Sequence, residues 1–238
     1  MTPTLIVTRP TPQGEAFAQA VLAQWDQPLQ VVLSPLITID PVPVLADLSD
    51  LKGVIFSSIN GVAAAERLDL PTNIPAWCVG KKTGALARQA GFDTSVGAGD
   101  VNALAQLIIE QSPNGQIAHI RGRHTRGDMS GRLTRAGIGC IDVVAYDQVA
   151  CALTNSARTI LKGKGSVVFP LFSPRTATIL GSEGSFSAPT YLVMMSDAVR
   201  DAASNLTAKE LITAARPDEK AMVVATLDVL RALTQGRG

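Results

Sequence analysis

The chain has 238 residues, 46% hydrophobic and 17% charged, a composition that can bury one large core or two modest ones. Lysine and arginine number 21 against 20 acidic residues, and a net charge of +1 creates no field for nucleic acid or an anionic membrane. There is no apolar run of bilayer length, and residues 1–7 are too short for a signal peptide, so we expect a cytoplasmic protein.

Short β-rich runs alternate with helical stretches along the chain. In chain order the clearest are a strand at Leu5–Thr8, a helix at Glu15–Trp25, strands at Gly53–Phe56 and Ala76–Val79, a helix at Asn102–Gln111 and a strand at Ser166–Phe169. Glycine, proline, serine or asparagine stands at most junctions, where turns and helix caps are expected. The alternation predicts βαβ units and a parallel sheet.

The two halves of the chain resemble each other at their strand-to-loop junctions. Four pairs of segments correspond: 5–10 with 117–122, 54–60 with 167–174, 77–83 with 192–197, and 96–100 with 214–219. The first pair places Arg9 and Arg121 just after a strand. The next two pairs place serine or threonine where a helix is expected to begin, at Ser58, Thr83, Ser173 and Ser196. Two copies of one α/β unit explain this repeat.

Two apolar stretches without helical period, residues 31–42 and 141–149, are predicted to be paired connecting strands. With that pairing, residues 1–36 and 148–238 form one discontinuous domain and residues 37–147 form an inserted one, each near the usual domain size. The predicted fold class is therefore α/β. It has two doubly wound, pseudo-duplicated parallel-sheet domains, joined by a two-stranded β connection with an interdomain cleft.

Loops at the carboxyl ends of parallel strands gather along one edge of a sheet, which predicts a polar site there. The side chains expected at this edge are Arg9, Ser58, Thr83, Arg121, Ser173 and Ser196. Hydroxyl groups and free N–H groups at helix starts suit an anion. Ordinary helix capping is the better explanation for any one of these hydroxyl residues, since Ser and Thr are common caps. Their recurrence at equivalent points in both halves moderately favours binding, so both interpretations stay open.

Other site chemistries find little support in the sequence. Three widely spaced cysteines, Cys78, Cys140 and Cys151, are expected to be buried thiols of a reducing compartment. With two histidines, His119 and His124, and no paired ligand spacing, no metal site is expected. Neither histidine has an evident nucleophilic partner and no Gly-x-Ser-x-Gly elbow is present, which disfavours a hydrolase triad.

Several fragments, in this order and spacing, resemble the uroporphyrinogen-III synthase family. They are residues 7–10, 54–62, 79–83, 133–137 and 144–146. The resemblance implies two α/β domains joined by two strands. It also implies conversion of hydroxymethylbilane into uroporphyrinogen III, with loss of water and inversion of ring D, in a cofactor-free monomer. Transient handover of the substrate from hydroxymethylbilane synthase is a further implied partnership.

The resemblance also implies roles for particular residues. Tyr146, on the expected interdomain strand, is the candidate acid for the departing hydroxyl, with a packed aromatic side chain as the alternative interpretation. Ser58 and Thr83 are expected to bind carboxylates of the substrate. Arg9, Arg121 and Arg126 are assigned as further anion contacts, with surface solvation as their alternative. Ser173 keeps the family's turn, whereas Ser196 replaces a turn that usually bears threonine.

Two other classes of protein remain open at the level of sequence. A non-catalytic two-lobed sensor for a small polycarboxylate would bind tightly and form no product. A sugar-transferring enzyme with two doubly wound lobes would be stabilised by a nucleotide sugar. No acidic pair or ribose-binding carboxylate is clearly placed for that transferase.

Overall fold

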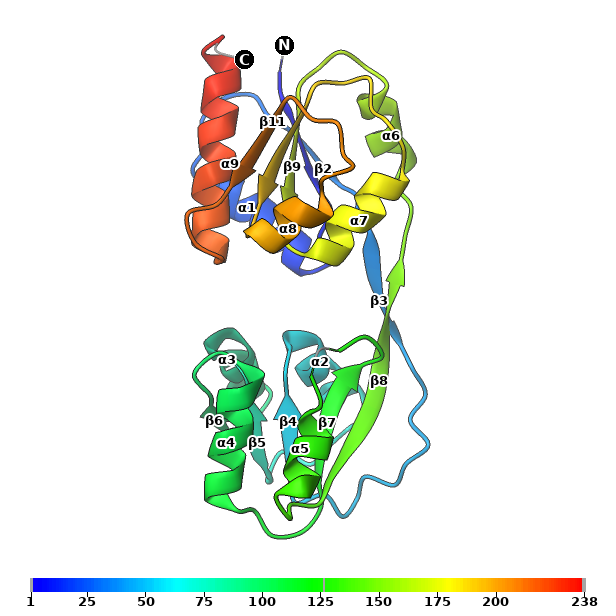
Figure 1. Cartoon of the computed structure of the whole chain (residues 1–238), viewed down its shortest axis with the longest axis vertical. Coiled ribbons are helices and arrows are strands. Elements are labelled where there is room, and N and C mark those ends of the chain that lie inside the picture. The colour runs from blue at the N-terminus through cyan, green and yellow to red at the C-terminus, as the bar shows by residue number, and fades with distance from the viewer. Residues whose placement is uncertain (1, 126, 237–238) are drawn as a thin grey trace. The chain divides into compact units, whose positions relative to one another are not determined.

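A computed structural model describes residues 2–125 and 127–236, which divide into two compact units. Unit 1 comprises residues 1–38 and 149–238 and unit 2 comprises residues 39–148. Each unit contains a parallel sheet covered by helices, so the predicted α/β class is confirmed. Figure 1 shows these elements within each unit. Among the described helices, none has the length and apolar character needed to cross a membrane.

Unit 1 is built on a five-stranded sheet in the order β11-β10-β9-β1-β2, with every adjacent pair parallel. Its strands are β1 (Thr4–Val7), β2 (Gln30–Leu33), β9 (Val167–Leu171), β10 (Thr190–Met194) and β11 (Glu210–Thr213). Its helices are α1 (Gln13–Leu22), α6 (Asn155–Leu161), α7 (Pro174–Ser182), α8 (Asp197–Ala202) and α9 (Glu219–Thr234).

Alternate residues of the unit 1 strands enter two separate cores. Leu5 and Val7 pack with residues of α1 and α9, whereas Ile6 between them packs with residues of α6, α7 and α8. This alternation follows from the two-residue period of a strand, and it shows that helices cover both faces of the sheet. The doubly wound arrangement predicted from the sequence is therefore present in unit 1.

Unit 2 is built on a six-stranded sheet in the order β3-β8-β7-β4-β5-β6. Its strands are β3 (Ile37–Pro41), β4 (Gly53–Phe56), β5 (Pro75–Cys78), β6 (Asp93–Val96), β7 (Ile117–Gly122) and β8 (Cys140–Ala150). Its helices are α2 (Ile59–Arg67), α3 (Lys81–Gln89), α4 (Val101–Gln111) and α5 (Met129–Arg135). Phe56 packs with residues of α2 and α3, and Ile55 with residues of α4 and α5, so this sheet is also covered on both faces.

The two sheets repeat one topology. The strand order of unit 1, β11-β10-β9-β1-β2, corresponds position by position to the parallel part of unit 2, β6-β5-β4-β7-β8. Helices α4 and α9, which follow β6 and β11, are both capped by aspartates, Asp100 and Asp218. The predicted duplication is therefore confirmed by the order of the strands.

The prediction that residues 31–42 and 141–149 are paired connecting strands is correct for the pairing but wrong for the extent of the first strand. The first segment forms β2, which belongs to the sheet of unit 1, and then β3, which lies beside β8. Between them Ser34 donates its N–H to Val7, and Pro35 has no N–H with which to continue a ladder. The N–H of Val42 bonds to Ala145 and that of Cys151 to Leu36, so β3 and β8 run antiparallel. The chain passes between the units within these two strands.

The burial predicted for the cysteines is correct only in part. Cys78 is buried, but Cys140 and Cys151 are partly exposed, and all three are free thiols. Burial raises the pKa of the Cys78 thiol to about 11. Desolvation, with the nearby Asp142 carboxylate, raises the pKa of Cys140 to about 12. Both groups therefore hold their protons at neutral pH.

Candidate active site

The strand order of unit 2 contains a topological switch point. From β4 the chain proceeds to β5 and β6 on one side of the sheet, whereas β7 proceeds to β8 on the other side. Crevices at the carboxyl ends of strands beside such a point are where open α/β sheets bind ligands. Ser57 and Ser58 follow the carboxyl end of β4, and Arg121 is the last residue but one of β7. This edge is the candidate active site of unit 2.

Ser58 and Tyr146 lie in direct contact at this edge. Ser58 is the N-cap of α2, where its Oγ accepts a hydrogen bond from the N–H of Asn60. The same Oγ lies 3.0 Å from the hydroxyl of Tyr146. Tyr146 is only 4% exposed, and a Cβ at Gly122 would lie 2.6 Å from its ring, so glycine is needed there. Tyr146 is therefore a packed aromatic residue whose hydroxyl is joined to a capping serine.

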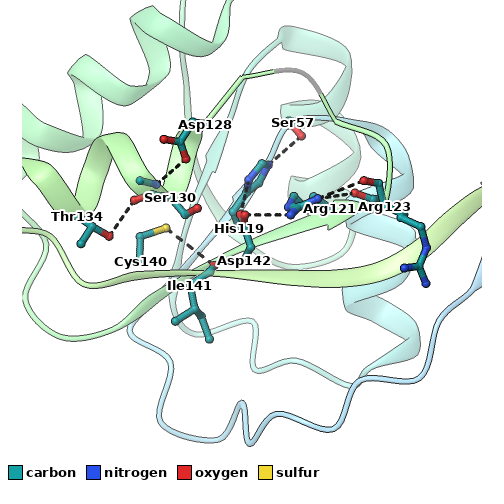
Figure 2. Close-up of polar contacts among 12 residues, drawn as sticks. Ser57, His119, Arg121, Arg123, Asp128, Ser130, Thr134, Cys140, Ile141 and Asp142 are labelled. Atoms are coloured by element: carbon teal, nitrogen blue, oxygen red, sulfur yellow. Dashed lines mark hydrogen bonds and ion pairs between the residues drawn. The ribbon is translucent and has the colours of Figure 1, made fainter.

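A second polar chain starts at the preceding residue, Ser57. Its Oγ lies 3.0 Å from Nε2 of His119, a residue of β7 that is 3% exposed. Nδ1 of His119 lies 3.3 Å from Oδ1 of Asp142 on β8, and Oδ2 of Asp142 lies 3.0 Å from a guanidinium nitrogen of Arg121. We call Ser57, His119, Asp142 and Arg121 the His119 network. Figure 2 shows these four side chains directed toward one another.

The charge state of Asp142 decides how the histidine is protonated. The hydrogen bond from His119 lowers the pKa of Asp142 to about 2, and Arg121 acts in the same direction against desolvation. Asp142 is thus a carboxylate at neutral pH and can only accept hydrogen bonds. Nδ1 of His119 must therefore carry a hydrogen, and in the neutral ring Nε2 is free to accept the proton of Ser57.

The expectation that neither histidine has a nucleophilic partner is wrong, because His119 contacts Ser57. The sequence contained one signal for this: His119 stands between the apolar residues Ala118 and Ile120 of a strand, and a buried polar group needs a partner. The adjacency of His119 and Asp142 is visible only from the register, in which His119 pairs with both Ile55 and Asp142. Ser57 follows Ile55 by two residues and so continues on the same face of the sheet.

The other predicted residues of unit 2 differ from Ser58 in their environment. Thr83 was expected to begin its helix, but it is the third residue of α3, and Gly80 is the N-cap. Thr83 is buried. Arg121 lies inside β7 rather than after it, since the strand continues to Gly122. Its guanidinium bonds to the carbonyl of Gly122 as well as to Asp142. Arg126 lies outside the described residues.

The predicted residues of unit 1 follow β1, β9 and β10. Arg9 lies 2.8 Å from Glu219 and 4.1 Å above the ring of Phe172, next to Ser173. Ser173 caps α7 by accepting from the N–H of Thr176. Ser196 is the N-cap residue of α8, and its side chain makes no capping hydrogen bond. Arg9 and Ser173 thus lie together at the switch point between β1 and β9.

Comparison with known structures shows the same fold. The crystal structure of uroporphyrinogen-III synthetase from Helicobacter pylori is similar with a TM-score of 0.67 at 17% identity, covering 96% of this chain and 100% of that one. A mutant uroporphyrinogen III synthase from Thermus thermophilus is similar with a TM-score of 0.51 at 14% identity, covering 98% of this chain and 100% of that one. No sequence among curated proteins matches the chain significantly.

The family assignment comes from the sequence model described as "Uroporphyrinogen-III synthase HemD", which matches residues 25–224. This range includes β4, β7 and β8 and therefore the whole His119 network and the Ser58–Tyr146 pair. It also includes most of both sheets. The chain belongs to the uroporphyrinogen-III synthase family.

Proposed function

We propose that this chain closes hydroxymethylbilane into uroporphyrinogen III, with loss of water and inversion of ring D, as the reaction of its family. The observation that carries the proposal is the Ser58–Tyr146 pair at the switch point of unit 2, in a chain whose family match spans residues 25–224. The substrate is a small polycarboxylate. No feature of the described residues favours the alternative of a non-catalytic anion sensor.

We assign Tyr146 as the acid that protonates the departing hydroxyl. Its buried phenol is 3.0 Å from Ser58 Oγ, and Ser58 is half-buried at the edge, so a proton can pass from the phenol through the serine hydroxyl to a bound substrate. A phenol suits a buried position because it donates without carrying a charge. The serine thus makes the contact that the buried ring cannot make itself.

Substrate carboxylates are assigned to donors at the carboxyl edges of both sheets. The assigned residues at these edges are Arg9, Ser58, Thr83, Arg121, Ser173 and Ser196. Arg126, which lies outside the described residues, is assigned with them from the sequence. A charge-assisted hydrogen bond contributes about 1.5–3 kcal/mol, so several such donors compensate for the near-zero net charge of the chain. The ion pairs of Arg9 and Arg121 mean that either arginine would have to share its guanidinium with the substrate.

We further propose that the enzyme acts in the cytoplasm as a monomer, receives its substrate from hydroxymethylbilane synthase and needs no cofactor. The net charge of +1 supports an enzyme without a nucleic-acid or membrane partner. We also propose that units 1 and 2 are its two domains.

The decisive test supplies enzymatically generated hydroxymethylbilane to the purified protein without added cofactor and separates the uroporphyrin isomers after oxidation. Predominance of isomer III supports the proposal, and isomer I alone, formed at the rate seen without protein, refutes it. In a second arm, Tyr146→Phe should lower kcat by about 10²-fold or more and leave the unfolding temperature unchanged. An unaltered kcat would remove Tyr146 from the mechanism. Tyr191→Phe, on β10 of unit 1, is the matched control.

A further inference from the structure

The His119 network contains a proton acceptor, which the Ser58–Tyr146 pair lacks. Loss of water from the substrate removes a hydroxyl from one carbon and a hydrogen from another, so catalysis needs both a proton donor and a proton acceptor. A phenol hydrogen-bonded to a serine is suited to donation. Nε2 of His119, directed at Ser57 while Nδ1 binds a carboxylate, is suited to acceptance.

The two polar chains begin at consecutive residues and descend on opposite faces of one sheet. Tyr146 packs with the core residues of α2 and α3. Ile55 and Ile117 pack with those of α4 and α5. Each isoleucine lies two residues before Ser57 or His119 in the chain, which places those two residues on the α4 and α5 face. Ser57 and Ser58 are each half-buried, and each contacts a buried side chain, His119 in one chain and Tyr146 in the other. A substrate at this edge would contact a donor and an acceptor side by side.

We propose that Ser57 and His119 form the basic arm of the reaction, in which Ser57 Oγ takes a proton from a ring carbon of the substrate and passes its own hydroxyl proton to Nε2 of His119. This inference rests on the proposed function. The C–H bond breaks, its electron pair restores the pyrrole ring, and the positive charge of the substrate moves to the imidazole. Asp142 stabilises the imidazolium that forms, and Arg121 holds the carboxylate in place from its other oxygen. Ser57 is the catalytic residue of this arm, and His119, Asp142 and Arg121 are positioning residues.

The groups around the imidazole favour this direction of transfer. From β8 it faces the Asp142 carboxylate, and the Cys140 thiol, which contacts the backbone of His119, is neutral because its pKa is raised to about 12. From β7, Arg121 reaches Asp142 but not the ring, and from α5 Ser130 hydrogen-bonds to Asp142 and lowers its pKa. The Asp142 carboxylate contacts Nδ1 directly and stabilises a positively charged ring, whereas Arg121 contacts the carboxylate and not the ring. The Ser57 hydroxyl is the contact at Nε2 through which a proton can arrive.

The test measures the rate of isomer III formation against pH for the wild type and for His119→Gln. Because a protonated imidazole cannot accept another proton, the wild-type kcat should fall as the pH is lowered. His119→Gln should lower kcat by about 10²–10⁴-fold, leave KM unchanged and lose this acidic limb. Asp142→Asn should move the limb to lower pH, since the amide no longer stabilises the imidazolium. The exposed His124, changed to Gln, is the matched control and should leave the profile unchanged.

Ser57→Ala provides the second variant, because it removes the hydroxyl that contacts Nε2 and keeps the imidazole itself. It should lower kcat by about 10²-fold or more at unchanged KM, with only the small fall in unfolding temperature that the loss of one hydrogen bond causes. If the wild type forms isomer III but His119→Gln keeps the acidic limb, or Ser57→Ala keeps its kcat, the basic arm is overturned while the proposed function stands. If the wild type forms isomer I alone, both are overturned.

Discussion

Units 1 and 2 share a strand order but carry different side chains at equivalent places. Ser58 and Ser173 cap the helices after β4 and β9, and the residues five positions earlier, Gly53 and Val168, pair with Ile117 and Leu5. This register makes Phe172 the counterpart of Ser57. It makes Val7 the counterpart of His119, and Leu33 that of Asp142.

The polar network of unit 2 is thus replaced in unit 1 by Phe172, Val7 and Leu33, of which Val7 is fully buried in the core and Phe172 packs against it. The arginine remains in both, as Arg9 and Arg121, each paired with a carboxylate. The duplicated fold therefore repeats its strand order and the caps of two helix pairs, α2 with α7 and α4 with α9, whereas a polar chain requires compatible residues at every position. Of the two units, unit 2 is the one whose switch point carries this connected polar network.

The largest expected effect tests whether the units fold separately. Phe56→Ala in unit 2 and Phe169→Ala in unit 1 each remove a fully buried ring and should cost about 3–5 kcal/mol. If the units are independent domains, hydrogen exchange should accelerate in residues 39–148 for the first variant and in the remainder for the second. Equal acceleration in both units would contradict the proposed domains. Leu45→Ala, at a side chain that is 97% exposed, should leave exchange unchanged.

A smaller effect should come from the Asp142 carboxylate of unit 2, which makes the free energy of unfolding depend on pH. The pKa of Asp142 in the folded protein is about 2, below the ordinary value of about 3.9, so its stabilising contribution is present above the ordinary pKa and is lost as pH falls toward 2. Allowing for solvent screening, this contribution is about 1 kcal/mol. In denaturant unfolding at pH 5 and pH 2–3, Asp142→Asn should therefore lose less stability than the wild type. An identical loss would show that the carboxylate is not stabilised as the structure indicates.

The smallest effects separate helix capping from substrate binding. Ser173→Ala removes a capping hydrogen bond and should cost about 1 kcal/mol, whereas Ser196→Ala removes none and should leave thermal unfolding nearly unchanged. If Ser196 binds a substrate carboxylate, its alanine variant should raise KM without a loss of stability. An unchanged KM would leave Ser196 without a role in binding. Ser58→Ala should affect both quantities, because its Oγ contacts both Asn60 and Tyr146.

The periodicity and junction residues of the sequence determine the strands, the helices and the duplicated order. These features follow from local preferences, namely the two-residue alternation of apolar side chains and the capping residues Ser58, Ser173, Asp100 and Asp218. The break between β2 and β3 was missed, although Ser34 and Pro35 mark it, because both segments are apolar and the sequence alone does not assign a strand to a sheet. The sequence suggests Thr83 as the start of α3 because threonine is a common cap, whereas the true N-cap, Gly80, has no side chain that would mark it.

The arrangement of the His119 network was decided by tertiary structure. Ser57, His119 and Asp142 come from three segments separated by 62 and 23 residues, and only the parallel register of β4, β7 and β8 brings them together. The sequence by itself determined the fold class, the repeat and the family, since these depend on patterns that are local or recur along the chain. Which polar groups meet depends on register, and register is set by the packing of two sheet faces against helices distant in sequence.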